Sequence, residues 1–160
     1  MKRILALLAA LMLLLTACRR EFSTDAEMVR FRFSHHGMVS SSFYCYTAEQ
    51  TETGWQMTVS LIGLDEEYAL EMTQEDADRL DALVRRCGLW KWNGFDKNDR
   101  NVMDGEGFDL TIRYADGKQL EASGDNAFPD GYKAAENEIN TYFKELLEQN
   151  GVMLTPERMG

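Results

Sequence analysis

The sequence predicts a single α+β domain built as a two-layer sandwich, in which an antiparallel sheet of six or seven strands carries two helices on one face. Three observations support this prediction. Several segments alternate apolar and polar residues as half-buried strands do, and two longer segments repeat apolar residues at helical spacing. The chain of 160 residues also has the length of one domain.

The strands of the first half are predicted from alternation and from the turn residues between alternating segments. Val29, Phe31 and Phe33 alternate with polar residues over 28–35, so one face of this strand is expected to be buried and the other solvated. Further strands are predicted over 39–48, 55–61 and 68–72, with turns at 36–37, 53–54 and 63–66.

An amphipathic helix is predicted over 74–87. Thr73 can cap its first turn, and Asp76 three residues later makes a variant of the capping box. Leu80, Leu83 and Val84 then follow helical spacing. Gly88 suits the position after the helix end. Residues 89–92 are expected to form a short extended piece and 93–107, which are polar and contain glycines, a loop.

The second half is predicted to form a hairpin and a helix. Residues 108–114 alternate, and Asp116-Gly117 is a strong hairpin signal before a partner strand over 119–123. After a loop over 124–131, a helix is expected from about 132 to 149, capped by Asp130 and ended by Gly151. Its buried side is predicted to comprise Ala135, Ile139, Tyr142, Phe143, Leu146 and Leu147.

The first eighteen residues have the features of a bacterial export signal. Residues 2–3 are basic and residues 4–15 are all apolar, a run too short for the roughly 20 residues of a membrane-spanning helix. Leu15-Thr16-Ala17-Cys18 follows and resembles the lipobox of bacterial lipoprotein precursors. An ordinary secretory signal with an incidental cysteine is the alternative, and a retained transmembrane anchor is a weaker one.

The lipobox resemblance implies a division of the chain. Residues 1–17 are then a signal peptide, and Cys18 is the lipid attachment site, carrying diacylglycerol and a fatty acid such as palmitate. Residues 18–26 are the lipidated cysteine and a tether, 27–152 a single domain and 153–160 a frayed tail. The protein is expected to be exported and lipid-anchored to the outer side of a bacterial membrane.

The charge balance limits the partners. The chain has 27 acidic and 17 basic residues and a formal net charge of −10. We therefore expect no nucleic-acid partner, since nucleic acids are bound through phosphates that need lysine and arginine. The same balance predicts that the acidic body stands off an anionic lipid surface.

Two cysteines remain once Cys18 is lipidated. An exported protein permits a disulfide. Cys45 lies on a predicted strand and Cys87 on the apolar side of a predicted helix, so a bridge between them across the helix–sheet interface is one hypothesis. Two buried free thiols are the other.

The polar segment 96–109 is the candidate metal site. Its possible ligands are Asp96, Asn98, Asp99, Asp104 and Asp109. Calcium binds six to eight oxygens from such loops, but the segment fails the EF-hand pattern at three defining positions. A solvated acidic loop is the alternative interpretation. His35 and His36 are expected to be surface residues at a turn, pointing to opposite faces.

Two further groups of residues are candidates for binding. Trp90, Trp92 and Phe95 lie close together, and Trp90 and Trp92 share a face if the segment is extended. Aromatic rings beside carboxylates can stack on sugar rings, although a role in the core is the simpler interpretation. Asp125 and Asn126 belong to the distinctive stretch 123–132, which leads into the last helix.

The sequence favours a binding or interaction module over an enzyme, with no cofactor and with an envelope protein, a peptide or a glycan as partner. Residues of about 90–147 resemble small bacterial lipoproteins of unknown function, a resemblance that implies no activity. The alternative is a small envelope hydrolase or a metal-dependent glycan-binding module that uses acids of 96–109. A structural protein with a self-associating sheet edge is a third hypothesis.

Overall fold

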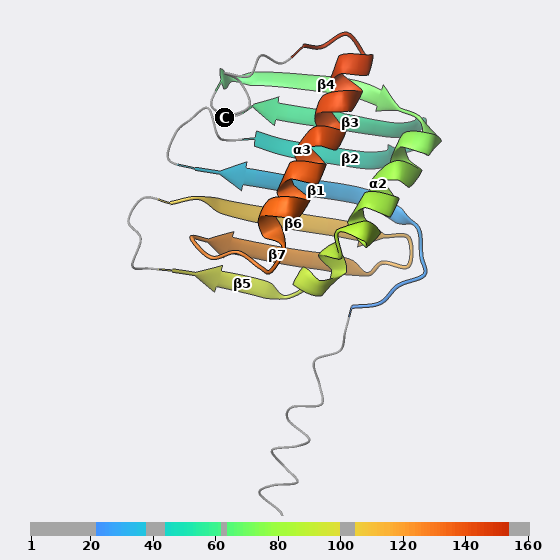
Figure 1. Ribbon diagram of the computed structural model, residues 1–160. Helices are drawn as coiled ribbons and strands as arrows, with labels where there is room; N and C mark the ends of the chain where they lie inside the picture. Colours follow the sequence, from blue (N-terminus) through green and yellow to red (C-terminus); the bar gives the residue numbers. More distant parts are fainter. Residues whose placement is uncertain (1–21, 38–43, 62–63, 100–104, 154–160) are drawn as a thin grey trace, which may run out of the picture.

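The computed structural model describes residues 22–37, 44–61, 64–99 and 105–153, and it shows a seven-stranded sheet with both α-helices on one face (Figure 1). The strand order is β4-β3-β2-β1-β6-β7-β5. The predicted two-layer α+β sandwich is therefore confirmed. In chain order the elements are β1 (Met28–His36), β2 (Tyr44–Thr51), β3 (Gly54–Leu61), β4 (Glu66–Met72), α2 (Gln74–Arg86), the 3-10 helix η3 (Leu89–Trp92), β5 (Phe95–Asn98), β6 (Gly107–Tyr114), β7 (Gln119–Asp125) and α3 (Tyr132–Gln149).

The central strand β1 divides the sheet into an apolar and a polar face. Phe31 and Phe33 are fully buried beneath the helices and lie opposite Ala48 and Tyr46 of β2. The alternate positions face away from the helices because successive strand residues point to opposite faces. We call this second side the open face; on β1 and β6 it carries Arg30, Arg32, Ser34, His36, Asp109, Thr111 and Arg113.

The prediction of a purely antiparallel sheet is wrong at one edge. Strand β5 pairs with β7 in parallel, with Phe95 opposite Ala122. This strand lies within 93–107, which was predicted as a loop. Its sequence Phe95-Asp96-Lys97-Asn98 contains only one apolar residue and has no alternation to detect. It pairs on one side only, and α2 and η3 carry the chain across the sheet so that β5 runs in the direction of β7 (Figure 1).

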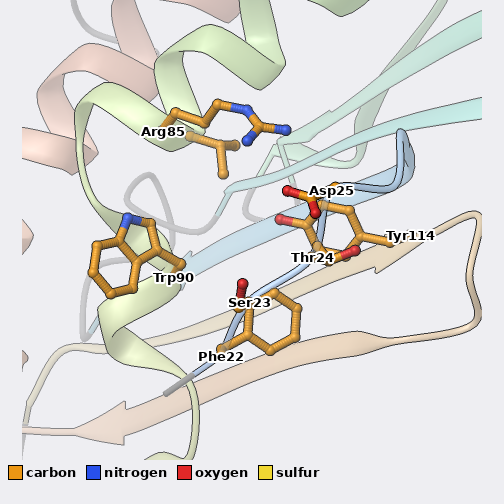
Figure 2. A pocket seen from close by; sticks show the side chains of 8 residues that line it. Phe22, Ser23, Thr24, Asp25, Arg85, Trp90 and Tyr114 are labelled. Carbon is orange, nitrogen blue, oxygen red and sulfur yellow. The ribbon is translucent and has the colours of Figure 1, made fainter.

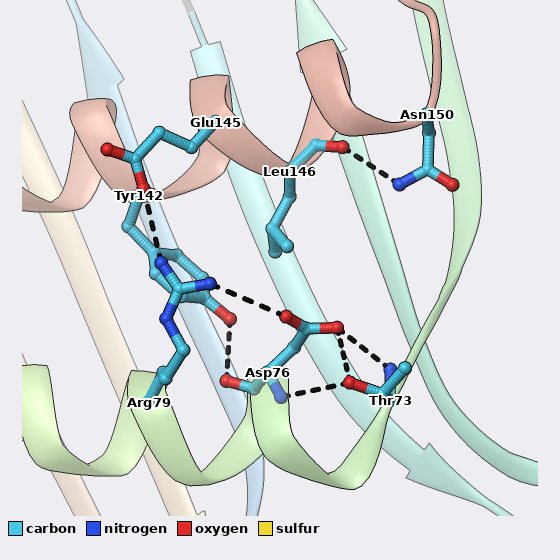
Figure 3. Close-up of polar contacts among 7 residues, drawn as sticks. All are labelled: Thr73, Asp76, Arg79, Tyr142, Glu145, Leu146 and Asn150. Atoms are coloured by element: carbon cyan, nitrogen blue, oxygen red, sulfur yellow. Dashed lines mark hydrogen bonds and ion pairs between the residues drawn. The ribbon is translucent and has the colours of Figure 1, made fainter.

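The predicted start of α2 is confirmed, and the same turn binds the two helices together. Thr73 and Asp76 form the capping box, with the Asp76 amide donating to the Thr73 hydroxyl at 3.1 Å. The Tyr142 hydroxyl of α3 donates to the Asp76 carbonyl at 2.7 Å, and Arg79 donates to Glu145 at 3.2 Å (Figure 3). The helix start is therefore fixed both locally and by its neighbour.

Residues 89–92 form the 3-10 helix η3, so the predicted extended piece is wrong. Leu89 and Trp92 are buried, whereas Trp90 is half-buried. In an extended segment Trp90 and Trp92 share a face, but in a 3-10 turn residues two positions apart diverge. The two tryptophans consequently have different surroundings.

Helix α3 crosses the strands over the middle of the sheet (Figure 1) and buries the side predicted for it. Phe143 stacks on Tyr46 with ring centroids 4.4 Å apart and an interplanar angle of 5°. The predicted cap by Asp130 is wrong, because Gly131 is the N-cap residue and none of the described side chains caps this end. Gly131 has a φ of 78°, a conformation that favours glycine, so the backbone itself makes the sharp entry into the helix.

The N-terminal segment 22–26 packs on the domain, although it was predicted to belong to the tether. The Phe22 ring lies 5.5 Å from the Tyr114 ring, centroid to centroid. The Thr24 hydroxyl donates to Asp116 at 3.0 Å, within the confirmed hairpin turn between β6 and β7. Within the described residues, packing on the domain therefore extends back to Phe22, beyond the predicted boundary at residue 27. Cys18 and the tail from 154 lie outside the described residues.

No helix in the described part of the chain is both long and apolar enough to cross a membrane.

The structure does not bring the two candidate disulfide partners together. Cys45 and Cys87 are free thiols. Cys45 lies opposite Ser34 and Ser60, on the open face, whereas Cys87 ends α2 on the other side of the sheet. The alternation of β2 places Tyr44 and Tyr46, and not Cys45, towards the helices.

We therefore predict two reactive thiols in the denatured protein. A chain without residues 1–17 and with Cys18→Ala should react with two equivalents of a thiol reagent in denaturant without reductant. Thiol titration against the reduced protein as control measures this. A chain that reacts only after reduction would show that Cys45 and Cys87 are bridged.

Candidate functional site

The predicted metal ligands do not converge. Asp96 and Asp109 both lie opposite Ser123 of β7, which separates them by two strand spacings, about 10 Å. Asp99 follows β5, and its amide donates to the Asp125 carbonyl at 2.9 Å. Asp104 lies outside the described residues. Among the side chains that the structure describes, no group of three or more His, Cys, Asp or Glu is arranged to hold a metal.

Asp96 and Asp109 instead line a shallow acidic groove of about 310 Å³ on the open face. The Ser123 hydroxyl donates to Asp96, and the Ser34 hydroxyl donates to Asp109, each at 3.4 Å. Glu121 adds a third carboxylate to the lining. Because Asp109 and Glu121 are exposed and lie on the flat open face, the groove offers solvated carboxylates rather than a desolvated acid–base pair.

Asp125 and Asn126 connect strand ends. Asp125 lies 3.1 Å from the His36 ring nitrogen Nε2 and accepts a hydrogen bond from Asn98 at 3.1 Å. The contact with His36 crosses Gly107, where any Cβ would collide with the His36 ring. Asn126 has a φ of 55°, and its amide donates to the Glu106 carbonyl at 2.8 Å. Both residues thus hold the end of β7 against the start of β6.

The three candidate aromatic residues differ in their surroundings: Trp90 borders a cavity, Phe95 borders the acidic groove, and Trp92 is buried. Trp92 is 4% exposed and donates to the Asp130 carbonyl at 3.3 Å, so it belongs to the core. Phe95 packs against Phe108 with ring centroids 6.1 Å apart. Trp90 is half-buried and borders a cavity beside the N-terminal segment. The core interpretation is therefore confirmed for Trp92.

The cavity beside Trp90 has a volume of about 380 Å³, and we call it the N-terminal pocket. It lies between the end of α2 and η3 on one side and the N-terminal segment and β6 on the other (Figure 2). Three aromatic rings border it, and charged groups come from both sides. The lining residues are Phe22, Ser23, Thr24, Asp25, Val84, Arg85, Trp90 and Tyr114.

A hydrogen bond holds the positive charge of the N-terminal pocket. Arg85 donates from Nε to Asp81 at 2.7 Å, and this hydrogen bond raises the pKa of the guanidinium. Burial raises the pKa of Tyr114, which keeps its phenol neutral. Asp25 lies near enough to Arg85 to add to the rise in its pKa. The pocket therefore combines a fixed cation, a carboxylate and neutral aromatic surface.

Sequence reasoning identified only Trp90 among these residues. Phe22 and Asp25 were assigned to a tether, and Arg85 was not considered as a binding residue. These residues come from segments far apart in the chain, and no spacing pattern joins them. The usable signal was Phe22 itself, an apolar aromatic residue within an otherwise polar segment.

A cluster of polar residues is buried between the sheet and the start of α3. His35 Nδ1 lies 3.1 Å from Glu136 Oε1 and 3.1 Å from the Tyr132 hydroxyl. Tyr44 donates to Glu136 at 2.8 Å, and Lys133 Nζ lies 2.8 Å from the other carboxylate oxygen. The prediction of His35 as a surface residue is wrong: it is 5% exposed because alternation places it on the same face as Phe33.

The environment of this cluster keeps His35 neutral. Burial lowers the pKa of His35 below the ordinary 6.5, and this outweighs the nearby Glu136, which raises it. Burial also raises the pKa of Tyr44 and Tyr132, so both phenols stay protonated. The partners of the cluster are one another, so it anchors α3 rather than presenting reactive groups to a ligand.

Comparisons with known proteins add no assignment. No protein-family model matches the chain, and no curated protein matches it.

We predict that stability falls as the pH drops below about 6.5. The unfolded chain protonates its histidine at this pH, whereas folded His35 has a lowered pKa, so protons favour unfolding. The free energy of unfolding that neutral His35 contributes is fully present above about pH 6.5. It is lost as the pH falls below this value, with a slope of at most about 1.4 kcal/mol per pH unit. Urea unfolding between pH 5 and 8 measures it.

The matched variants are His35→Gln and His36→Gln. His35→Gln should flatten the pH dependence between about 5 and 6.5 more than the same substitution at His36 does. An unchanged slope in His35→Gln would contradict the assignment of the titration to His35.

Proposed function

We propose that this chain is an exported lipoprotein of the bacterial cell envelope whose domain binds a ligand in the N-terminal pocket and is not an enzyme. The export and the anchor rest on the apolar run 4–15 and on the lipobox-like Leu15-Thr16-Ala17-Cys18. The binding role rests on the pocket. Its volume of about 380 Å³ falls within the range of small-ligand sites, and a few polar groups converge on apolar walls there.

A sugar unit of a glycan is the ligand class that this lining fits best. The rings of Trp90, Tyr114 and Phe22 offer apolar faces against the C–H faces of a sugar ring. Asp25 can accept hydrogen bonds from sugar hydroxyls, and Arg85 can donate to their oxygens. A cationic ligand would be repelled by Arg85, and an anionic ligand would be repelled by Asp25. A neutral ring with polar groups avoids both repulsions and therefore suits both walls.

The hydrolase alternative has less support. It requires two carboxylates of 96–109 to flank one scissile bond, with environments that separate their pKa values. Asp96 and Asp109 lie on either side of β7, and each accepts a hydrogen bond from a serine. We therefore retain the binding role and not the hydrolase.

The proposal predicts that the protein is anchored to the membrane through Cys18. Expressed in a bacterial host, the wild-type chain should partition into the detergent-rich phase and incorporate a labelled fatty acid. Cys18→Ala should lose both properties, because its side chain cannot form the thioether. Detergent phase separation measures the shift, with Cys87→Ala as the control. Equal partitioning of Cys18→Ala and wild type would contradict lipidation at Cys18.

The proposal also predicts that the N-terminal pocket binds a sugar. A short oligosaccharide of N-acetylglucosamine should quench the tryptophan fluorescence of the wild-type protein. Trp90→Ala should weaken binding about tenfold or more, since it removes a stacking surface of the kind that dominates binding sites.

Phe128→Ala is the matched control, because Phe128 is an exposed aromatic residue outside the pocket and should keep full affinity. Because Trp90→Ala also removes a fluorescent side chain, calorimetry is used to distinguish loss of binding from loss of the fluorescence signal. Equal affinities of Trp90→Ala and wild type for the sugar, or no binding of any oligosaccharide by the wild type, would overturn the pocket assignment.

A further inference from the structure

The open face carries a group of three arginines. Arg30 and Arg32 lie on β1, and Arg113 lies on β6 next to them; we call these residues the arginine cluster. Arg30 lies directly opposite Arg113 in the register. Like charges directly opposite each other destabilise a sheet, so this arrangement costs stability. In a chain with a net charge of −10, such a concentration of positive charge points to an anionic partner.

Two members of the arginine cluster have no ion-pair partner among the residues that the structure describes. Arg30 lies 3.6 Å from a carboxylate oxygen of Glu49. Within the described ranges, no carboxylate lies within 4.0 Å of Arg32 or Arg113. Both side chains are exposed, and Arg32 is flanked in the register by the hydroxyl residues Thr47 and Thr111. Guanidinium groups with adjacent hydroxyls suit phosphate oxygens.

The charges of the open face are distributed unevenly along the strands. Arg30 and Arg113 lie at the end where the N-terminal segment packs, and Arg32 lies at the middle of β1. Glu49, Glu71 and Glu121 partly offset them on that half. The other half carries four acids but no lysine or arginine at its described outward positions; these acids are Glu67, Asp96, Asp109 and Asp125. Charge therefore changes from mixed to acidic away from the N-terminal segment.

We infer that the arginine cluster contacts the anionic lipid headgroups of the membrane that holds the anchor, so that the N-terminal end of the open face lies on the bilayer. The inference rests on the proposed lipidation of Cys18. Four residue steps separate Cys18 from Phe22, so that end of the domain stays within about 15 Å of the lipidated cysteine. The open face is tilted in this orientation, so that its N-terminal end meets the phosphates and its acidic half is directed away from them.

The anchor explains why so few arginines suffice. A basic residue near an anionic surface favours the contact about fivefold, and the attraction decays within a Debye length of about 8 Å. Three such residues would not hold a freely diffusing acidic protein. For a domain already tethered by acyl chains the contact is intramolecular, so the arginines set the orientation rather than the affinity. Net charge alone predicts a domain that stands off the bilayer, but the uneven distribution favours this contact.

The test measures orientation in the lipidated protein. A fluorescent label is placed at Gln56, which shares a cross-strand row with Glu49 and Arg30 on the open face, or at Glu75, exposed on α2. The proteins are reconstituted into vesicles of phosphatidylglycerol and phosphatidylcholine that contain a headgroup quencher. We expect the Gln56 label to be quenched at least twofold more than the Glu75 label, and the difference to vanish in pure phosphatidylcholine or in high salt.

The decisive variant is the double substitution Arg32→Gln and Arg113→Gln. It should equalise the quenching of the two labels. The double substitution Arg86→Gln and Lys144→Gln removes the same charge from the helices and should leave the difference intact. Equal quenching of both labels in the wild type, or identical behaviour of the two double variants, would overturn the inference.

Two further outcomes separate this inference from the proposed function. A protein that does not float with the vesicles would lack the anchor, which overturns the proposed lipidation together with the inference. A protein that floats, shows equal quenching and binds soluble polyglutamate through Arg32 and Arg113 would assign the arginine cluster to an acidic protein surface instead. Binding of the oligosaccharide by the same sample reports on the N-terminal pocket independently.

Discussion

Two helices bury one face of the seven-stranded sheet, and the contact of α3 with the central strands governs this arrangement. Phe143 lies between Tyr46 and Phe31, with ring centroids 4.4 Å and 6.0 Å away. Burial of such a side chain contributes about 2–3 kcal/mol. Because α2 packs beside α3 on the same face, no helix in the described chain covers the opposite face. The strands must therefore be polar on that side, and the open face results from this one-sided burial.

The buried polar cluster adds specificity to a contact that aromatic packing alone would leave loosely defined. His35 and Tyr44 reach Glu136 from two adjacent strands, so α3 can satisfy its buried carboxylate in only one position along the sheet. Buried polar groups must be matched because an unpaired one costs about 1–3 kcal/mol. The aromatic layer thus brings α3 to the sheet, while Glu136 fixes its register.

Sequence patterns predicted the strands and helix ends that depend on interactions between neighbouring residues. Alternation located β1, β3 and β6, and the capping residues Thr73 and Asp76 located the start of α2. Predictions failed where contacts between distant parts of the chain determine the structure. Strand β5 exists because β7 presents a free edge to it. For His35 the alternation of β1 already indicates burial beside Phe33, but its polar partner Glu136 comes from α3, far away in the sequence. The N-terminal pocket combines Phe22, Arg85 and Trp90, which only the folded chain brings together.

The N-terminal segment links the anchor to both proposed contact surfaces. Phe22 packs on Tyr114, and the Thr24 hydroxyl binds the hairpin turn through Asp116, so the chain that leads from Cys18 is part of the pocket wall. The pocket opens between this segment and α2, on the helix side of the sheet, whereas the arginine cluster lies on the open face. Headgroups held by the cluster would therefore leave the pocket accessible. Because β1 continues directly from this segment, the same short stretch of backbone positions the ligand wall on one side and Arg30 on the other, and membrane contact and ligand binding need not compete.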